Sequence, residues 1–243
     1  VLSACFDRPF IVDTLIESLH AMDKRHRVLL HPIIRHHDGR RVSLIYVELE
    51  RIAKESDREK IATRIRNRFA DLMLMSDDFG QMLARNQEAI SALGARPAAG
   101  FAEEEQNEFA AYLSWLADGG FVFLGSRTWR IAAAGAKLHH VESADLGLFR
   151  TADSEFRKQL DEVQEDAQFL ARSDQTIHFS KIFAESPVHR HARIDLLAFK
   201  VPGGSAGEET IQLTIGLFTS KARSQEASSV PLIRRKLHSI LER

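Results

Sequence analysis

The chain has 243 residues, of which 44% are hydrophobic and 28% charged, a composition typical of a globular protein and not of a disordered one. Its 33 Lys and Arg residues against 34 Asp and Glu residues give a formal net charge of −1, which argues against a nucleic-acid-binding surface. The single cysteine, Cys5, excludes a disulfide framework and a cysteine-based zinc site within one chain. Asp7 and Arg8 interrupt any apolar signal segment, and no apolar run approaches the roughly 20 residues of a membrane-spanning helix. We therefore expect a cytoplasmic protein, cut from a longer chain because it opens on VLSACF without Met.

The first stretch predicts a strand followed by a helix. Residues 1–6 are apolar and predict a short buried strand. Asp7 is a good capping residue, and Pro9 is tolerated in a first turn because its missing N–H is not needed there. The apolar residues of the expected helix recur at helical spacing: Ile11, Leu15, Leu19 and Met22.

A hairpin is predicted next. Two apolar runs, 28–34 and 42–49, flank the pair Asp38-Gly39, and such a pair favours the positive φ angles of a tight hairpin turn. The second run is apolar on both faces, since alternate residues of a strand point to opposite sides. Its outer face therefore needs a cover, either another sheet or another subunit.

Two amphipathic helices are expected after the hairpin, one over residues 61–72 and one over 79–93, the second capped by Asp77 or Asp78. The order so far is β-α-β-β-α, which predicts an α+β protein with a ferredoxin-like first domain. We expect this domain to span residues 1–94.

Residues 95–101, rich in Gly, Ala and Pro, predict a linker, so that residues 102–243 form a second α+β domain. Its expected elements, in chain order, are a helix with Phe109, Tyr112, Leu113 and Leu116 that stops at Gly119-Gly120, strands at FVFLGSRTWRI and KLHHV, a helix over 153–170, strands near 175–183 and 192–201, a turn at PGGSAGEE, a strand over 210–219, and a helix from Pro231 with Ile233, Leu237, Ile240 and Leu241 inward.

Two histidine-rich stretches raise the question of a metal site. His36 and His37 would leave opposite faces of a strand, and His31 lies roughly 20 Å from His37 along an extended strand, so we expect a polar hairpin tip instead. His189 and His191 share a face if their strand is extended, which makes a two-histidine ligand pair an alternative.

The arginines around that second pair favour a different chemistry. Arg190 and Arg193 would repel a cation, and guanidinium groups suit a carboxylate or phosphate, so anion binding is preferred over metal. The chain has no glycine-rich dinucleotide or phosphate-loop motif and no nucleophile elbow. Taken alone, the residues give no assembled active site.

Five stretches in order along the chain share a pattern: DRPFIVDTLIESL with LLHPIIR and VSLIYVELER, then WLADGGFVFLGSRTW, LGLFR, SPVHRHARIDLLAFK, and IGLFTSKARSQEASSVPLIRRKLHSILER. Together they resemble the N-terminal region of the large bacterial NAD-specific glutamate dehydrogenases. The groups GLFTS and PLIRRK are the most specific. Ser126 stands where the family usually has tyrosine, and Leu196-Leu197-Ala198 stands where it has Y-I-G.

The resemblance implies ACT-type domains, which are β-α-β-β-α-β modules that often bind amino acids between paired copies. It implies a homo-oligomer formed by sheet pairing and an amino-acid effector. The charge balance and the short apolar runs predict no nucleic-acid or membrane partner. NAD would bind elsewhere in the parent enzyme, which deaminates L-glutamate to 2-oxoglutarate, so this region would hold no cofactor and would not catalyse on its own.

We expect an effector, if one binds, at the turn carrying Asp7 and Arg8, where a helix start favours a carboxylate, with Asp13 receiving an amino group. His189 and Arg190 form a second candidate. The alternatives are that Asp7 only caps the helix and Arg8 is solvated, that the chain is a scaffold without a ligand, or that it is a metal-dependent enzyme using His189 and His191.

Overall fold

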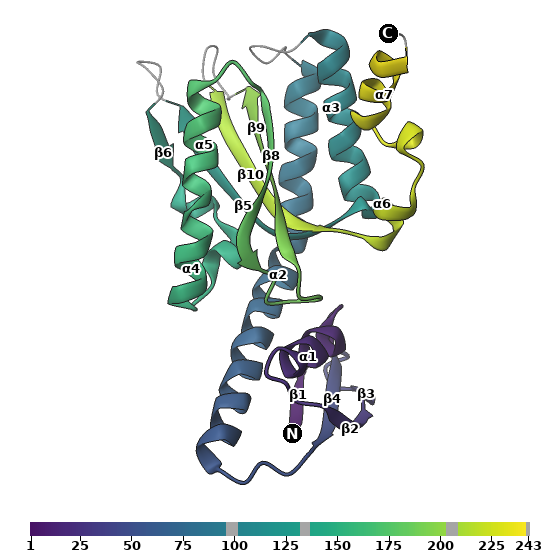
Figure 1. Cartoon of the computed structure of the whole chain (residues 1–243), viewed down its shortest axis with the longest axis vertical. Coiled ribbons are helices and arrows are strands. Elements are labelled where there is room, and N and C mark those ends of the chain that lie inside the picture. The colour runs from purple at the N-terminus through teal and green to yellow at the C-terminus, as the bar shows by residue number, and fades with distance from the viewer. Residues whose placement is uncertain (96–101, 132–136, 203–208, 242–243) are drawn as a thin grey trace. The chain divides into compact units, whose positions relative to one another are not determined.

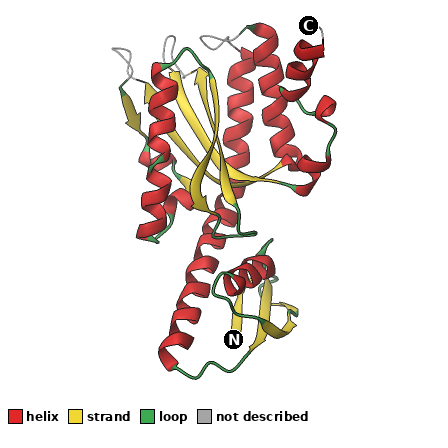
Figure 2. Ribbon diagram, viewed as in Figure 1, coloured by secondary structure: helices red, strands yellow, loops and turns green. Residues whose placement is uncertain are grey.

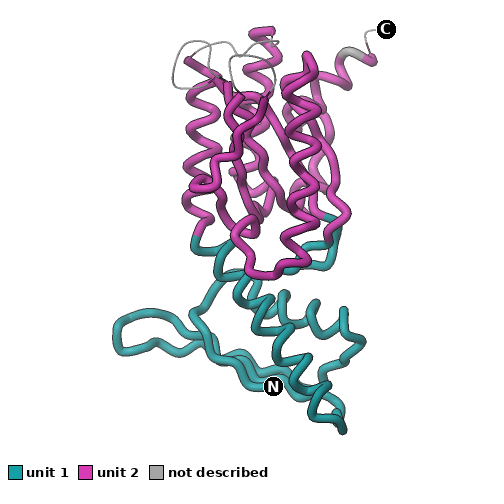
Figure 3. The backbone as a smooth tube through the Cα atoms, turned by 90° about the vertical axis from the view of Figure 1, so that its left-hand side faces the viewer, with its two compact units in different colours: residues 1–77, 185–193 teal, residues 78–184, 194–243 magenta. Residues whose placement is uncertain are grey.

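The computed structural model describes residues 1–95, 102–131, 137–202 and 209–241. The chain divides into two compact units, unit 1 with residues 1–77 and 185–193 and unit 2 with residues 78–184 and 194–243 (Figure 3). Each unit contains its own sheet and helices, which confirms the α+β class. The division falls inside one long helix, between Asp77 and Asp78, whereas the sequence placed a boundary after residue 94. Apart from Ala95, the expected linker lies outside the described residues.

Unit 1 is built on a four-stranded antiparallel sheet (Figure 1). Its strands are β1 (Leu2–Phe6), β2 (His26–Leu30), β3 (Ile33–Arg35) and β4 (Arg41–Leu49). Strand β4 lies in the middle, with β1 on one side and both β2 and β3 on the other. The expected strand over 28–34 is therefore interrupted at His31-Pro32, where proline offers no N–H to the ladder. Among the described residues no further strand pairs with β1, so the four long strands of a complete ferredoxin-like sheet are not present.

The hairpin at Asp38-Gly39 is confirmed. Gly39 has a φ of 84° and its N–H donates to the carbonyl of His36 at 2.9 Å. The carboxylate of Asp38 accepts from the backbone N–H of Arg40 at 3.0 Å and from its guanidinium, and these bonds lower the pKa of Asp38 to about 2. The turn thus uses Asp38 for local structure.

The helices of unit 1 are α1 (Ile11–His20) and the first part of α2 (Glu55–Ala95). The core is formed by buried side chains of α1, β4 and α2, among them Leu15, Leu19, Ile45, Val47, Ile61 and Ile65. The prediction that Asp7 caps α1 is wrong. The N-cap position is Phe10, with φ 66° and no side-chain cap, because Asp7 is bound to the sheet instead.

The prediction of two separate helices after the hairpin is wrong, since residues 55–95 form one helix. Neither Asp77 nor Asp78 caps a helix. Both carboxylates are engaged in tertiary contacts, Asp77 with Arg8 and Asp78 with Arg150, so neither interrupts the helix. Nothing between the two expected helices is a glycine or proline, and the helical period therefore continues.

The other side of the unit 1 sheet carries apolar side chains that remain exposed. In the strand register Leu2, Tyr46 and Leu30 form one row across the sheet, and Phe6, Val42 and Ile34 form another. We call this surface the open face; its exposed large side chains are Leu2, Phe6, Val28, Leu30, Ile34 and Tyr46. The prediction that β1 is buried is wrong, because β1 lies at the sheet edge and Leu2 is 76% exposed.

Unit 2 contains a curled antiparallel sheet of six strands (Figure 2). Its strands are β5 (Phe121–Ile131), β6 (Leu138–His140), β7 (Leu146–Gly147), β8 (Ile177–Glu185), β9 (Arg193–Pro202) and β10 (Glu209–Phe218). They follow the order β6-β5-β10-β9-β8, and β7 pairs with β5. The helices are the second part of α2, α3 (Glu103–Trp115), α4 (Ser154–Asp161), α5 (Val163–Arg172), α6 (Ser220–Ser224) and α7 (Ile233–Leu241).

Helices cover both faces of the middle of this sheet. Nearly every residue of β9 and β10 is buried, although consecutive residues point to opposite faces. Helix α5 packs on β10, and Phe109 of α3 packs edge-to-face on Phe199 of β9 with ring centroids 5.1 Å apart. This arrangement places α3 beside β8 and β9, where the cavity described below opens.

Most strands expected in the second half are confirmed, including the return strand at KLHHV, which is β6. The helix expected over 153–170 is two helices that meet at Glu162. The inward face predicted for the last helix is wrong, since Ile233, Ile240 and Leu241 are 45%, 66% and 82% exposed. The turn at PGGSAGEE falls largely outside the described residues. In the described parts of the chain, no helix is long and apolar enough to cross a membrane.

Candidate functional site

The structure engages Asp7 and Arg8 in contacts within unit 1. Asp7 accepts a hydrogen bond from the hydroxyl of Ser43 at 2.7 Å and pairs with Arg41 at 2.9 Å. Arg8 pairs with Asp77 of α2 at 2.7 Å. These two predicted effector residues therefore hold the start of α1 against the sheet and against α2.

The structure brings the other candidates together at the first turn of α1. Residues 185–193 belong to unit 1, and there the Nδ1 atom of His189 lies 3.4 Å from the carboxylate of Asp13. The backbone N–H of His189 donates to the hydroxyl of Thr14 at 2.9 Å, and its ring lies 4.3 Å from that of Phe10. Burial lowers the pKa of His189, the carboxylate of Asp13 opposes this, and the charge of Arg190 adds to the lowering. Asp13, His189 and Arg190 are thus neighbours, as a single site would require.

The geometry does not favour metal binding by the histidine stretches. His191 contacts the carboxylate of Glu185 at 3.0 Å while His189 faces Asp13, so the two rings serve different partners. Their segment is bent and not extended. Across the described residues, no three His, Cys, Asp or Glu side chains are grouped closely enough to hold a metal ion.

The prediction that His36 and His37 leave opposite faces of a strand is wrong. Their rings lie only 4.0 Å apart and do not leave opposite faces, because both residues belong to the turn and not to the strand. His36 contacts Asp38 at 3.0 Å, and His31 is hydrogen-bonded to Ser43 at 2.9 Å.

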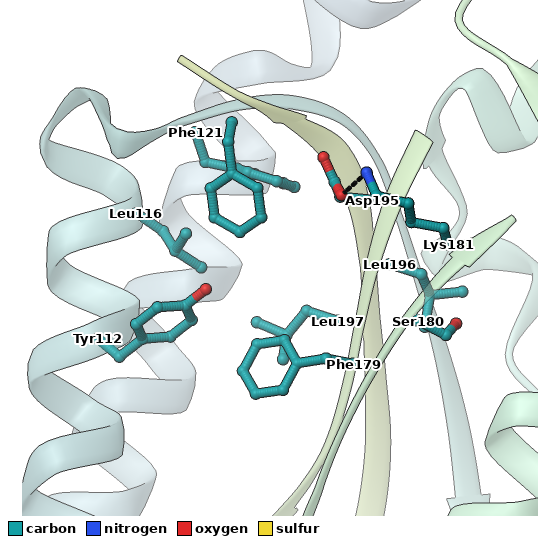
Figure 4. A pocket seen from close by; sticks show the side chains of 10 residues that line it. Tyr112, Leu116, Phe121, Phe179, Ser180, Lys181, Asp195, Leu196 and Leu197 are labelled. Carbon is teal, nitrogen blue, oxygen red and sulfur yellow. Dashed lines mark hydrogen bonds and ion pairs between the residues drawn. The ribbon is translucent and has the colours of Figure 1, made fainter. Parts of the chain in front are cut away.

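A cavity of about 320 Å³ lies in unit 2 between α3 and the strands β8 and β9 (Figure 4). We call it the Tyr112 cavity. Its lining residues come from five elements and from the turn before β5: Tyr112, Leu116, Phe121, Phe179, Ser180, Lys181, Asp195, Leu196, Leu197 and Phe218. Most of this lining is apolar, and such concave, mainly apolar spaces with a few polar groups are the usual form of small-molecule sites.

Three polar groups converge on the cavity. The amine of Lys181 on β8 forms an ion pair with the carboxylate of Asp195 on β9. The hydroxyl of Tyr112 points into the same space from α3 (Figure 4). Burial raises the pKa of Tyr112, and the negative charge of Asp195 raises it further, so the hydroxyl stays protonated and able to donate. Ser180 also lines the cavity, but its hydroxyl donates to Asp166 at 2.9 Å and is already used.

Aromatic rings form the walls. Tyr112 and Phe179 meet edge-to-face at 5.6 Å, and Phe121 and Phe218 meet at 5.2 Å. A second cavity of about 570 Å³ shares Tyr112 and Phe179 with the first and continues along α3 toward α7. Phe179 lines both cavities and is 45% exposed, so its side chain also contacts solvent.

Sequence reasoning missed this site. The helical pattern predicts Tyr112 only as an apolar-face residue of its helix, and no pattern in the sequence marks Lys181 or Asp195 as a site residue. Lys181 and Asp195 are 14 residues apart and meet because β8 and β9 are neighbours in the sheet. The one signal in the sequence is the charged residue Lys181 between Phe179 and Phe183, because alternate positions of a strand share one face.

Other buried charges of unit 2 serve the fold. Arg127 is almost fully buried; it binds Asp145 and Asp161, each at 2.9 Å, and lies 4.3 Å over the ring of Phe149. With each donor group matched to a carboxylate or a ring, this cluster is a closed structural network.

Comparison with known proteins gives a distant relationship. No family model matches the chain. The NAD-specific glutamate dehydrogenase of Pseudomonas aeruginosa is 28% identical over 203 residues, and that of Halomonas elongata is 24% identical over 208 residues. Each alignment covers 83% of this chain, but the chain spans only 12% and 13% of the lengths of these relatives. The chain is therefore distantly homologous to one part of large NAD-specific glutamate dehydrogenases.

Proposed function

We propose that the chain is a non-catalytic N-terminal segment of a large cytoplasmic NAD-dependent glutamate dehydrogenase, and that its role is regulation and assembly. In this proposal the catalytic and NAD-binding parts, which convert L-glutamate to 2-oxoglutarate, lie outside these residues. The homology to about one eighth of two such enzymes supports it. The absence of a dinucleotide-binding glycine motif from the sequence agrees with it.

Unit 1 is, in this proposal, an ACT-type module that pairs with a second copy. Strands β2 and β3 are the two parts of one interrupted strand, so β4 is the third strand of the module. The order β1-β4-β2 is therefore first-third-second, which is the order in a β-α-β-β-α-β module and supports the assignment. The amino-acid effector expected at Asp7, Arg8, Asp13, His189 and Arg190 stays a prediction.

The observation that carries the proposal is the open face of the unit 1 sheet. Leu30 is 55% exposed and stands in one row with Tyr46 and Leu2, and the row of Phe6, Val42 and Ile34 is also apolar. Contiguous apolar surfaces of this kind are rare on monomers and mark interaction sites. A second copy of the same sheet fits this surface because a two-fold interface places a patch against itself.

Charge at the two ends of the open face favours a second copy in an antiparallel arrangement. The guanidinium of Arg40 lies 4.2 Å over the ring of Phe6 at one end of β4. Glu48 stands at the other end, exposed and opposite Val28. Antiparallel packing of two β4 strands brings Arg40 of one copy to Glu48 of the partner subunit, twice in each dimer.

The oligomeric state of the 243-residue chain tests the proposal. Light scattering after size-exclusion chromatography should give a dimer or a multiple of it, and Tyr46→Lys should shift it to monomer because a charge would be buried in the interface. Arg40→Glu and Glu48→Arg should each weaken the dimer, and the double variant should restore it. Phe183→Lys, at a more exposed aromatic position on β8, is the control and should leave the oligomeric state unchanged.

A chain that is monomeric at all concentrations would refute the proposal. So would a dimer that Tyr46→Lys leaves intact, since the interface would then lie elsewhere. Failure of the double charge reversal to restore the dimer would refute the antiparallel arrangement.

A further inference from the structure

The Tyr112 cavity combines an ion pair, a phenol donor and apolar walls, and nothing in the fold of unit 2 requires this combination. Asp195 is almost buried, so its carboxylate needs a partner, and Lys181 supplies one from the neighbouring strand. Lys181 itself is more than half exposed, so it reaches the carboxylate from the solvent side. A charged pair therefore stands at the rim of a cavity whose interior is lined with aromatic rings.

The carboxylate of Asp195 contacts Lys181 through one oxygen, Oδ1. In Figure 4 the second oxygen points away from Lys181, and the hydroxyl of Tyr112 points into the cavity from the opposite wall. Asp195 lies close enough to this hydroxyl for its charge to raise the pKa of Tyr112. The cavity thus offers the carboxylate of Asp195 to a cation, the amine of Lys181 to an anion, and the hydroxyl of Tyr112 as a neutral hydrogen-bond donor.

We propose that the Tyr112 cavity binds a free α-amino acid with a large apolar side chain. The ammonium group of this ligand contacts Asp195, its carboxylate contacts Lys181 and the hydroxyl of Tyr112, and its side chain lies among Phe121, Phe179 and Leu197. This inference goes beyond the regulatory and assembly role proposed above, because it places a ligand in unit 2 and not at the effector residues expected in unit 1.

The charges of the cavity select this class of ligand over simpler ones. A monocarboxylate must compete with Asp195 for Lys181, and a monoamine must compete with Lys181 for Asp195. A ligand that carries both charges on adjacent atoms replaces one ion pair by two and leaves neither protein charge unpaired. A purely apolar ligand would leave the hydroxyl of Tyr112 buried without an acceptor.

Size and wall chemistry define the side chain. A cavity of about 320 Å³ accommodates an amino acid the size of leucine or phenylalanine. The rings of Tyr112 and Phe179 stand edge-to-face at one wall, and aromatic surfaces of this kind suit an aliphatic or aromatic side chain. A carboxylate side chain, as in glutamate, would be desolvated against these rings without a cationic partner.

Isothermal titration calorimetry on the full 243-residue chain tests the proposal with matched ligands. L-Leucine and L-phenylalanine should bind. Their analogues without the amino group, 4-methylpentanoate and 3-phenylpropanoate, and without the carboxylate, isopentylamine and 2-phenylethylamine, should each bind at least about tenfold more weakly, as should L-glutamate. Binding of a single-charge analogue as tight as that of its parent amino acid would overturn the proposal, as would no detectable binding of either amino acid at about 1 mM.

Three variants locate the ligand. Tyr112→Phe keeps the ring and removes only the hydroxyl, and Lys181→Met keeps the chain length and removes the charge, so both should weaken L-leucine binding by about tenfold. Phe183→Ser changes an exposed residue on the same strand outside the cavity and should leave the dissociation constant unchanged. Unchanged binding in the correctly folded Tyr112→Phe variant would place the ligand elsewhere. The open-face variants alter the oligomeric state and not this titration, so the two proposals fail independently.

Discussion

Neighbouring aspartates on α2 offer a matched test of which charges hold the fold. Asp78 is almost fully buried; its carboxylate accepts from the backbone N–H of Gly147 at 2.7 Å and from the guanidinium of Arg150 at 2.7 and 2.8 Å. Asp77, the next residue along the same helix, forms a surface pair with Arg8. Replacing each aspartate by alanine changes helix propensity equally, so the difference between the two variants reports the contacts alone.

The expected difference follows from burial. Hydrogen bonds to a charged group contribute about 1.5–3 kcal/mol, and Asp78→Ala also leaves the N–H of Gly147 buried without an acceptor, so we expect a loss of about 3 kcal/mol. Arg150 is 48% exposed and can return to water, which keeps the loss from being larger. The side chain of Asp77 is 59% exposed, and an exposed ion pair contributes only about 0–1 kcal/mol.

During urea and thermal unfolding, tryptophan fluorescence follows unit 2, which contains Trp115, Trp129, Asp78 and its partners, and circular dichroism follows both units, including the Asp77–Arg8 pair of unit 1. In thermal unfolding the Asp78→Ala variant should lose about 6–12 °C in Tm, given about 2–4 °C per kcal/mol for a chain of this size. Asp77→Ala should change Tm by less than about 3 °C. Equal effects of the two substitutions would show that the buried contact to Gly147 does not stabilise unit 2.

Two further predictions concern backbone and pH. Gly147→Ala should destabilise unit 2 by more than about 2 kcal/mol in the same urea assay, because φ is 61° and an added Cβ would lie 2.2 Å from the carbonyl oxygen of Leu124; a loss below about 0.5 kcal/mol would contradict that geometry. For His189 the folded-state pKa is lowered by burial despite Asp13, so the unfolded chain takes up the proton first and stability falls as pH drops below about 6.5 toward the folded pKa. His189→Gln should therefore flatten the decline of the unfolding free energy between pH 7 and 5, and an unchanged or steeper decline would show that His189 is not responsible.

Local patterns in the sequence predicted local structure well. The Asp38-Gly39 hairpin forms because both residues suit the turn, and β8, β9 and β10 follow from their apolar runs. The sequence did not predict that residues 55–95 form one helix. The paired aspartates in its middle resemble a helix start, and only their tertiary partners, Arg8 and Arg150, show why they are tolerated there.

Sites formed by residues that are far apart in the sequence could not be predicted from local patterns. Asp13 and His189 meet only because the segment between β8 and β9 belongs to unit 1, which no spacing rule reveals. The polar groups of the Tyr112 cavity come from one helix and two strands, and each looks like an ordinary residue of its own element. Strand pairing, not a motif, brings Lys181 to Asp195.

The glycine motifs that carry the resemblance to glutamate dehydrogenases serve the architecture of unit 2. Gly147, in LGLFR, lets the chain pass directly over the carbonyl of Leu124, where any Cβ would collide. Gly216, in IGLF, lies at a register shift between β10 and β5, where an added Cβ would lie 2.3 Å from the carbonyl of Val122. At both positions the close approach of other atoms leaves no room for a side chain, so these glycines maintain the architecture of unit 2. The binding properties must then depend on the side chains that surround this fold, which is why the open face and the Tyr112 cavity, and not the shared motifs, are the places to test function.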